Sequence, residues 1–342
     1  MLMKGEDTMR NSIPIRRYFF LILLVSLFLA CSTVMASSPQ VWKIGHVRSS
    51  GSSVDKDIHT FVENITEQTS GDISFNIYPG NRLGDYSTVQ ERVSFGEVEM
   101  YVGPVATSID KRLMLAFTPF LVTNWSEAQK MYSHGTPMMN AIEEYLEAQN
   151  IKLLGGWPVY FGGIALTAKP VAPGNPDISK DMIIRVPPIK SFEMTARALG
   201  YTPYPITWMY AKMGLKTGMV TGLIGGGAEG YAGLSEYIKY YIPLKDHFEY
   251  WFVYMNLDIW KSLSGKTKNI FNKAAAKMEI DRYAVAEAEE EKSLTRLKTG
   301  GIEIIELTDL EQSALQAKVK SQVWPLLKEE TGPVFDTIVN QK

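Results

Sequence analysis

The first third of the chain switches between the apolar period of a strand and that of a helix. Residues 41–47 are mostly apolar and predict a strand, and residues 58–65 carry apolar side chains at helical spacing. Apolar and polar residues alternate over residues 73–77, which predicts a second strand before a Pro-Gly turn. A helix over residues 89–93 and a strand over residues 98–102 follow. Strand, helix and strand in succession indicate a parallel α/β sheet.

The rest of the chain continues in this style without a detectable sequence repeat. The pattern predicts helices over residues 131–146 and 192–199, and strands over residues 151–154, 183–186 and 219–224. A second α/β lobe is the simplest account of these elements.

One long helix is predicted from residue 264 to residue 299, because the apolar residues keep helical spacing throughout. Residues 287–291 form an acidic run within it. Consecutive carboxylates point in different directions around a helix, so we interpret the run as a solvated face and not as a metal site. The sequence predicts no metal centre.

The first 36 residues have the order of an export signal. Two arginines precede an almost unbroken apolar stretch over residues 18–30, and small residues precede a cut after Ala36. Cleavage there leaves a mature chain that begins at Ser37. Cys31 offers the alternative of a lipid anchor, but the residues before it fit a lipoprotein signal poorly, so we favour release into the periplasm.

Composition limits the classes of function. The chain has 342 residues, 45% of them hydrophobic, and a net charge of −2, so more than one core is possible and nucleic-acid binding is not favoured. Beyond the N-terminus no apolar run reaches the roughly 18 residues that a membrane-spanning helix needs. Cys31 is the only cysteine, so the mature chain is expected to form no disulfide and to use no thiolate chemistry.

Several segments, taken in order, form a recognisable set. Residues 42–46 read Trp-Lys-Ile-Gly-His, and residues 78–85 form a turn that ends in Leu-Gly-Asp. Residues 96–100 read Gly-Glu-Val-Glu-Met, residues 177–187 contain Ile-Arg-Val-Pro, and residues 215–222 read Leu-Lys-Thr-Gly-Met-Val-Thr-Gly. This set resembles the extracytoplasmic solute-binding subunits of tripartite ATP-independent periplasmic (TRAP) transporters, the DctP-like family, over nearly the whole mature chain.

The resemblance implies a two-lobed periplasmic-binding-protein fold of the α/β class. Hinge strands would join the lobes, the ligand would lie between them, and a long helix would span both. Lobe I is expected to comprise residues 37–162 plus 251–290, and lobe II residues 163–250 plus 291–342. The hinge is expected near Gly162-Gly163 and Tyr250-Trp251. Delivery of the ligand to TRAP membrane subunits is also implied. A monomer is our default, because no coiled-coil seam is evident.

Arg185 matches the arginine that binds the substrate carboxylate in the family. A guanidinium presents a planar donor fork that meets a carboxylate in two hydrogen bonds, and it remains charged. Many relatives carry a second arginine in the segment that corresponds to residues 161–167, but this stretch has no basic residue here. Polar residues that follow Gly222 in relatives are replaced by Leu223-Ile224-Gly225-Gly226. We therefore expect one carboxylate clamp and a roomier, more apolar pocket.

The candidate ligand-binding residues combine one cation with aromatic, glycine and small polar positions near the expected cleft. They are Arg185, Trp208, Tyr210, Gly225, Gly226, Tyr160, Phe161, Trp251, His46 and Ser49. Aromatic side chains supply stacking surface for a ring. We predict a monocarboxylate ligand with an apolar or aromatic body, such as an aryl or indolyl oxo acid, ahead of a C4-dicarboxylate or a sugar acid.

One segment favours a different chemistry. Residues 225–230 satisfy the G-x-G-x-x-G pattern between a predicted strand and a predicted helix, and Asp246 could bind a ribose. The alternative is an exported nucleotide-dependent oxidoreductase. We disfavour it, because a lone motif of this kind is weak and lies far from any opening βαβ unit.

Hydrolase chemistry has less support. The sequence contains no G-x-S-x-G elbow and no H-E-x-x-H pair, and its four histidines, His46, His59, His134 and His247, are scattered. The sequence therefore predicts neither an enzyme nor a cofactor.

Overall fold

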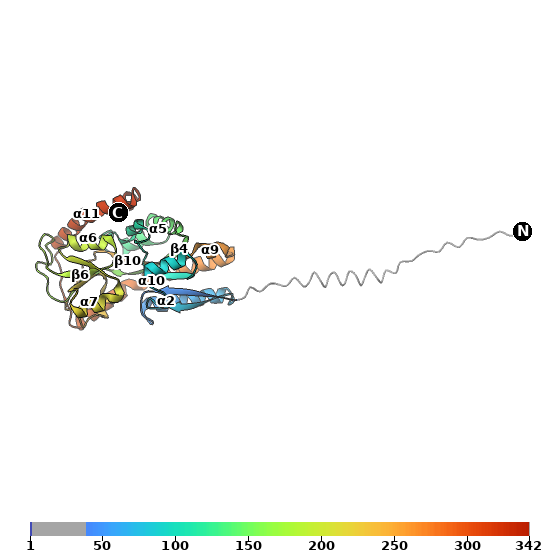
Figure 1. Ribbon diagram of the computed structural model, residues 1–342, viewed down its shortest axis with the longest axis horizontal. Helices are drawn as coiled ribbons and strands as arrows, with labels where there is room; N and C mark the ends of the chain where they lie inside the picture. Colours follow the sequence, from blue (N-terminus) through green and yellow to red (C-terminus); the bar gives the residue numbers. More distant parts are fainter. Residues whose placement is uncertain (2–38, 342) are drawn as a thin grey trace. The chain divides into compact units, whose positions relative to one another are not determined.

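The computed structural model describes residue 1 and residues 39–341, and the chain from Gln40 onward contains two β-sheets (Figure 1). The predicted cut after Ala36 and the alternative at Cys31 lie outside the described residues. Throughout residues 39–341, no helix is both long enough and apolar enough to cross a membrane.

The first sheet has five strands in the order β2-β1-β3-β10-β4. β1 runs parallel to β2 and β3, whereas β10 runs antiparallel to β3 and β4. The bounds are β1 Gln40–His46, β2 Ile73–Tyr78, β3 Met100–Gly103, β4 Ile151–Phe161 and β10 Phe248–Asn256. The four strands predicted here are confirmed, although β4 continues well beyond its predicted end.

Helices flank this sheet where the apolar spacing predicted them. α2 (Ser53–Gln68) buries Ile58, Phe61 and Ile65 in a cluster shared with β1 and β10. α3 (Tyr86–Ser94) follows the turn after β2, and the side chain of Asp85 caps its first turn by accepting from Thr88 N.

The second sheet has six strands in the order β11-β9-β5-β8-β6-β7. β6 runs parallel to β7 and β8, and β5 runs antiparallel to β8 and β9. The bounds are β5 Gly163–Leu166, β6 Ile183–Val186, β7 Thr202–Pro205, β8 Gly222–Gly226, β9 Tyr240–Ile242 and β11 Glu303–Ile304. The strand at 183–186 is confirmed, and the strand predicted at 219–224 begins three residues later.

The remaining helices lie around the two sheets. Their bounds are η1 Lys111–Phe117, α4 Trp125–Tyr132, α5 Pro137–Glu147, α6 Lys190–Ala198, η2 Trp208–Tyr210, α7 Ala211–Thr217, α8 Ala228–Ala232, α9 Leu257–Ser262, α11 Asp309–Thr331 and α12 Val334–Val339. We call the first sheet with α2, α3 and α5 the first lobe, and the second sheet with α6, α7 and α8 the second lobe.

The helix predicted over residues 131–146 is confirmed for residues 137–146, which belong to α5, but its continuity from residue 131 is wrong. α4 ends at Tyr132, and α5 starts afresh with Thr136 as its N-cap, whose Oγ1 accepts from Met139 N at 3.3 Å. Pro137 occupies the first turn of α5, where its missing N–H costs nothing. The cap and the proline were the available sequence signals for this break.

The long helix predicted over residues 264–299 is confirmed as α10 (Gly265–Thr299), which packs on β4 and α2 of the first lobe and on α8 of the second (Figure 1). Its acidic run is only partly a solvated face. Glu290 turns inward and accepts hydrogen bonds from Phe161 N and Trp125 Nε1, at 2.7 and 2.9 Å. Burial raises the pKa of Glu290.

The chain passes between the sheets three times. The first passage leaves β4 at Phe161 and enters β5 at Gly163, the second runs between Ile242 and Phe248, and the third leads from β10 through α9 and α10 to β11. The crossing expected at Tyr250-Trp251 falls inside β10. The first two passages bond to each other, since Gly162 N donates to His247 O at 2.9 Å. A Cβ on Gly162 would lie 2.0 Å from the His247 ring, so only glycine allows this approach.

Candidate functional site

A cavity lies between the two lobes, where the carboxyl ends of β1, β6 and β8 meet. About 670 Å³ of it is free of protein atoms, counting the space at its mouth. Ligands of open α/β sheets bind at such strand ends. Its walls are Val47, Arg48, Asn81, Asp85, Tyr86, Pro104, Phe117, Tyr160, Arg185, Pro187, Ile189, Phe192, Thr207, Trp208, Met209, Gly225, Glu249 and Trp251.

Arg185, on β6, is the buried cation of this cavity and is only 2% exposed. Its Nε donates to Ile206 O at 2.8 Å and its Nη1 to Ile224 O at 3.3 Å, which fixes the plane of the guanidinium. Burial lowers the pKa of Arg185 to about 10, so the group stays charged at neutral pH. Among residues 39–341 it forms no ion pair with a carboxylate. A buried charge without a counterion is costly, and an anionic ligand would remove that cost.

Arg48 brings a second guanidinium to the cavity, two residues after β1. Its Nη2 donates to Tyr160 Oη at 3.3 Å, and its Cζ lies 5.3 Å from the ring centroids of both Trp208 and Trp251. Trp208 lies in η2, which follows β7 of the second sheet, and Trp251 lies in β10 of the first sheet. The Arg48 side chain therefore contacts rings from both sides of the cavity. The sequence interpretation missed Arg48, although it chose His46 and Ser49 on either side of it.

Aromatic side chains make most of the wall between these two cations. Tyr160 comes from β4, Trp251 from β10 and Trp208 from η2, and all three were predicted. Trp251 is held from behind by stacking on Trp157 at 5.4 Å between centroids. Such a wall suits a flat apolar group. Three further rings that were not predicted from the sequence also line the cavity: Tyr86, Phe117 and Phe192.

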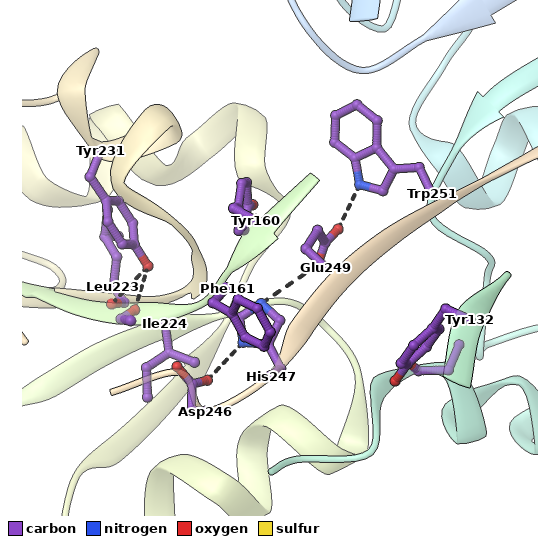
Figure 2. Close-up of polar contacts among 12 residues, drawn as sticks. Tyr132, Tyr160, Phe161, Leu223, Ile224, Tyr231, Asp246, His247, Glu249 and Trp251 are labelled. Carbon is purple, nitrogen blue, oxygen red and sulfur yellow. Dashed lines mark hydrogen bonds and ion pairs between the residues drawn. The ribbon is translucent and has the colours of Figure 1, made fainter. Parts of the chain in front are cut away.

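A chain of buried acids and a histidine supports the floor of the site (Figure 2). Trp251 Nε1 donates to Glu249 Oε1 at 2.6 Å, His247 Nε2 lies 3.6 Å from Glu249 Oε2, and His247 Nδ1 lies 2.8 Å from Asp246 Oδ2. Burial alone would lower the pKa of His247, but the charge and the hydrogen bond of Asp246, together with the nearby carboxylate of Glu249, outweigh it and raise the pKa to about 9. His247 is therefore a cation at neutral pH.

This raised pKa predicts a pH-dependent stability. Because the folded pKa of His247 is about 9 and the unfolded value about 6.5, its contribution is complete below pH 6.5 and is lost as the pH rises through 9. The loss should be on the order of 3 kcal/mol in the free energy of unfolding, measured by urea denaturation from pH 6 to 10. His247→Gln should be less stable at pH 6 and should flatten this slope; an unchanged slope would contradict the assignment.

Two more polar side chains reach the cavity with atoms that have no partner among residues 39–341. They are Asn81 Oδ1, from the turn after β2, and Thr207 Oγ1, just before η2. Buried polar atoms are normally hydrogen-bonded, so a polar guest is expected to meet them. Asn81 and Thr207 come from opposite lobes.

Five predicted site residues do not line the cavity. His46 is buried and bonds through Nε2 to Asp55 Oδ1 at 2.9 Å, and Ser49 is exposed in the loop beyond. Phe161 packs on Trp125 and Phe248 in the core. Tyr210 points to solvent, with 56% of its surface exposed, and Gly226 lies against the ring of Tyr231.

The glycines of the G-x-G-x-x-G segment serve packing. Gly225 lines the cavity with φ of +81°, and a Cβ there would lie 2.4 Å from Pro187, so a side chain would strain the wall beside Arg185. A Cβ on Gly227 would lie 2.5 Å from the Tyr160 ring. The following helix α8 has five residues, and Asp246, the proposed ribose acid, is fully buried against His247.

Comparison with known families decides the broad class. The model of the bacterial extracellular solute-binding proteins of family 7, DctP, matches residues 44–329. The chain belongs to the DctP family. It is 21% identical over 308 residues to the sialic acid-binding periplasmic protein SiaP of Vibrio cholerae. The aligned residues cover 87% of this chain and 91% of SiaP.

Solved DctP-type structures agree with the fold. The solute receptor DctP7 of Bordetella pertussis, which binds pyroglutamic acid, superposes with a TM-score of 0.79 at 19% identity over 88% of this chain and 98% of that one. A TRAP periplasmic solute-binding protein of Desulfovibrio salexigens with bound orotic acid gives a TM-score of 0.80 at 18% identity over 88% and 96%. The predicted TRAP family and two-lobed α/β fold are confirmed.

The DctP family is a family of solute-binding receptors. Within residues 39–341, no group of three or more histidine, cysteine, aspartate or glutamate side chains could hold a metal ion. The cavity walls contain no histidine, serine or cysteine that could act as a nucleophile or as its base.

Proposed function

We propose that this DctP-family chain is an exported receptor that encloses a small organic carboxylate and delivers it to TRAP membrane subunits, without catalysing a reaction. One observation carries the proposal: Arg185 is a fixed, buried cation in the cavity between the lobes, and no carboxylate among residues 39–341 forms a close ion pair with it. A ligand carboxylate supplies that counterion. It would accept from Nη1 and Nη2, the two nitrogens that a carboxylate spans best.

For the ligand's body we propose an apolar or aromatic group, as in an aryl or indolyl oxo acid. Trp208, Trp251 and Tyr160 surround the space beside Arg185, and the three further rings extend the same wall. The glycine at 225 leaves this space open where a side chain would fill it. Pyroglutamic and orotic acids, bound by the two similar structures, are likewise small acids built on a ring.

A C4-dicarboxylate or a sugar acid is the second candidate, and Arg48 is the observation that favours it. Its guanidinium lies in the same cavity and forms no ion pair among residues 39–341. A second anionic group on the ligand could bind there. Against this, Arg48 already contacts two indole rings and a phenol, which satisfies a guanidinium without a second anion.

Thermal-shift and calorimetric screens distinguish these ligands. We expect indole-3-acetate and phenylpyruvate to raise the melting temperature by about 5 °C at a hundredfold excess over Kd. The methyl ester of indole-3-acetate, which lacks the acid group, should have no effect. Stabilisation only by succinate, malate or a uronate would replace the first candidate with the second, and stabilisation by NAD alone would revive the oxidoreductase.

Capture should couple to closure, because a ligand that contacts both lobes favours the form in which both contacts are made. The passages at Gly162 and between Ile242 and Phe248 are where such a movement would bend the chain. Small-angle scattering with and without the stabilising acid would measure it, and would also test the monomer. An unchanged radius of gyration would count against closure.

A further inference from the structure

Glu249 is a second buried charge that lines the cavity, and the proposed function gives it no role. It lies on β10, is 8% exposed, and reaches the cavity beside Trp251 (Figure 2). Among residues 39–341 it forms no ion pair within 4 Å with Arg48 or Arg185, although its charge acts on Arg185 over a longer distance. The cavity therefore contains anionic and cationic side chains that do not neutralise each other directly.

The bonds of Glu249 leave part of its carboxylate open. Oε1 accepts from Trp251 Nε1 at 2.6 Å, and Oε2 lies 3.6 Å from His247 Nε2, which is too far for a good hydrogen bond. A carboxylate has about four lone-pair positions, and a buried one is stabilised when two or three of them accept. Oε2 therefore has lone-pair positions open to a further donor.

The other acid of the cavity behaves differently. Asp85 caps α3, and its Oδ1 accepts from Thr88 N at 2.9 Å and from Ser87 Oγ at 2.8 Å. These bonds lower the pKa of Asp85 against the opposing effect of burial. Asp85 has therefore a structural role that accounts for its position, whereas the carboxylate of Glu249 accepts from a single donor, Trp251 Nε1, among residues 39–341.

We propose that Glu249 is a specificity-determining residue that accepts a hydrogen bond from an N–H or O–H group on the body of the ligand. The site would then select carboxylic acids that carry such a donor away from their acid group. This inference rests on the proposed function, since Arg185 holds the acid group at the other end. It also disfavours a second carboxylate near β10, where Glu249 would repel it.

The alternative role for Glu249 is structural, because it also orients the indole of Trp251 and neutralises His247. A structural role makes binding depend on the residue but gives no preference for a donor on the ligand. The preference itself is therefore the quantity to measure.

Indole-3-acetate and 1-benzofuran-3-acetate provide that measurement, because they share shape and acid group but only the indole has an N–H. Calorimetry on the wild-type protein should give a Kd for the benzofuran about 10 to 100 times higher, the usual effect of leaving a buried acceptor without its charged hydrogen bond. Equal affinities would overturn the role of Glu249 while leaving the carboxylate receptor intact.

Glu249→Met tests whether Glu249 is the acceptor, since methionine keeps the length and removes the charge. The ratio of the two Kd values should fall to about one in this variant. Glu193→Met, an acid on α6 outside the cavity walls, is the matched control and should retain the wild-type ratio. If Glu249→Met keeps the wild-type ratio of the two Kd values, another group accepts the hydrogen bond from the indole N–H. If this variant does not fold, Glu249→Gln, which keeps the shape and removes the charge, takes its place, and its ratio should fall below the wild-type value.

A sugar acid provides a separate test of the same residue. If only D-glucuronate binds, its hydroxyl groups are the donors, and Glu249→Met should weaken it at least 10-fold; unchanged binding would overturn the proposal. If no acid of either class binds the wild-type protein, the proposed function itself fails and this inference fails with it.

Discussion

Replacing Arg185 with alanine is expected to weaken binding of the carboxylate ligand by about 10²- to 10³·⁵-fold. The variant leaves the ligand's acid group enclosed without its cation, and stranding one member of a buried ion pair costs on the order of 3 to 5 kcal/mol. Isothermal calorimetry with the acid that stabilises the wild-type protein measures the change. Arg185→Lys should recover only part of the loss, because a point charge cannot supply two parallel hydrogen bonds.

Arg197→Ala is the matched control, because Arg197 lies exposed on α6, the helix that follows β6. It should bind as the wild type does. Removing Arg185 also frees the carbonyl groups of Ile206 and Ile224, so the ligand-free variant should be checked by thermal melting before its affinity is interpreted. Undiminished binding in a folded Arg185→Ala protein would remove Arg185 from the site and withdraw the main support for the proposed function.

Most of the fold was readable from the sequence because each lobe alternates strands and helices of different apolar period. The spacing of Ile58, Phe61 and Ile65 predicts α2, and α2 buries those side chains. Arg185 could be placed at a strand end by resemblance, and the structure puts it in the cavity wall. These features depend on local sequence, which is why they could be predicted.

The face of a strand to which each side chain points was harder to predict. Tyr160 and Phe161 were both chosen, but neighbouring residues of a strand point to opposite faces, and only Tyr160 faces the cavity. Gly225 and Gly226 divide in the same way. β4 and β10 are buried on both faces, so they lack the polar alternation that would have shown which face is which.

Contacts between distant segments were not predictable at all. Arg48 meets Trp208 and Trp251 only because the two lobes face each other, and a basic residue in a loop of small residues gives no sign of that. The burial of Glu249 within an apolar strand is equally invisible in sequence, since it depends on Trp251 and His247 folding around it. The second guanidinium and the second acid of the cavity are therefore findings of the structure.

Arg282 illustrates the same limit for stability. It lies in α10, is 2% exposed, and its Nε donates to Pro158 O at 2.9 Å, while its guanidinium stacks on Trp157 at 4.2 Å and pairs with Glu289. Pro158 has no N–H and interrupts the ladder between β4 and β10 near a register shift. Arg282 thus secures the irregular part of β4, directly behind the aromatic wall of the cavity.

Arg282→Ala is expected to lower the free energy of unfolding by about 3 to 5 kcal/mol, because it removes a buried hydrogen-bonded charge and opens a gap over Trp157. Urea denaturation near pH 7 measures this. Arg282→Met should be less damaging, since it keeps the packing over the indole and loses only the polar bonds. Arg296→Ala, at an exposed position on the same helix, should change stability by less than about 0.5 kcal/mol. Equal stability of Arg282→Ala and Arg296→Ala would mean that β4 is held at Pro158 by its other neighbours.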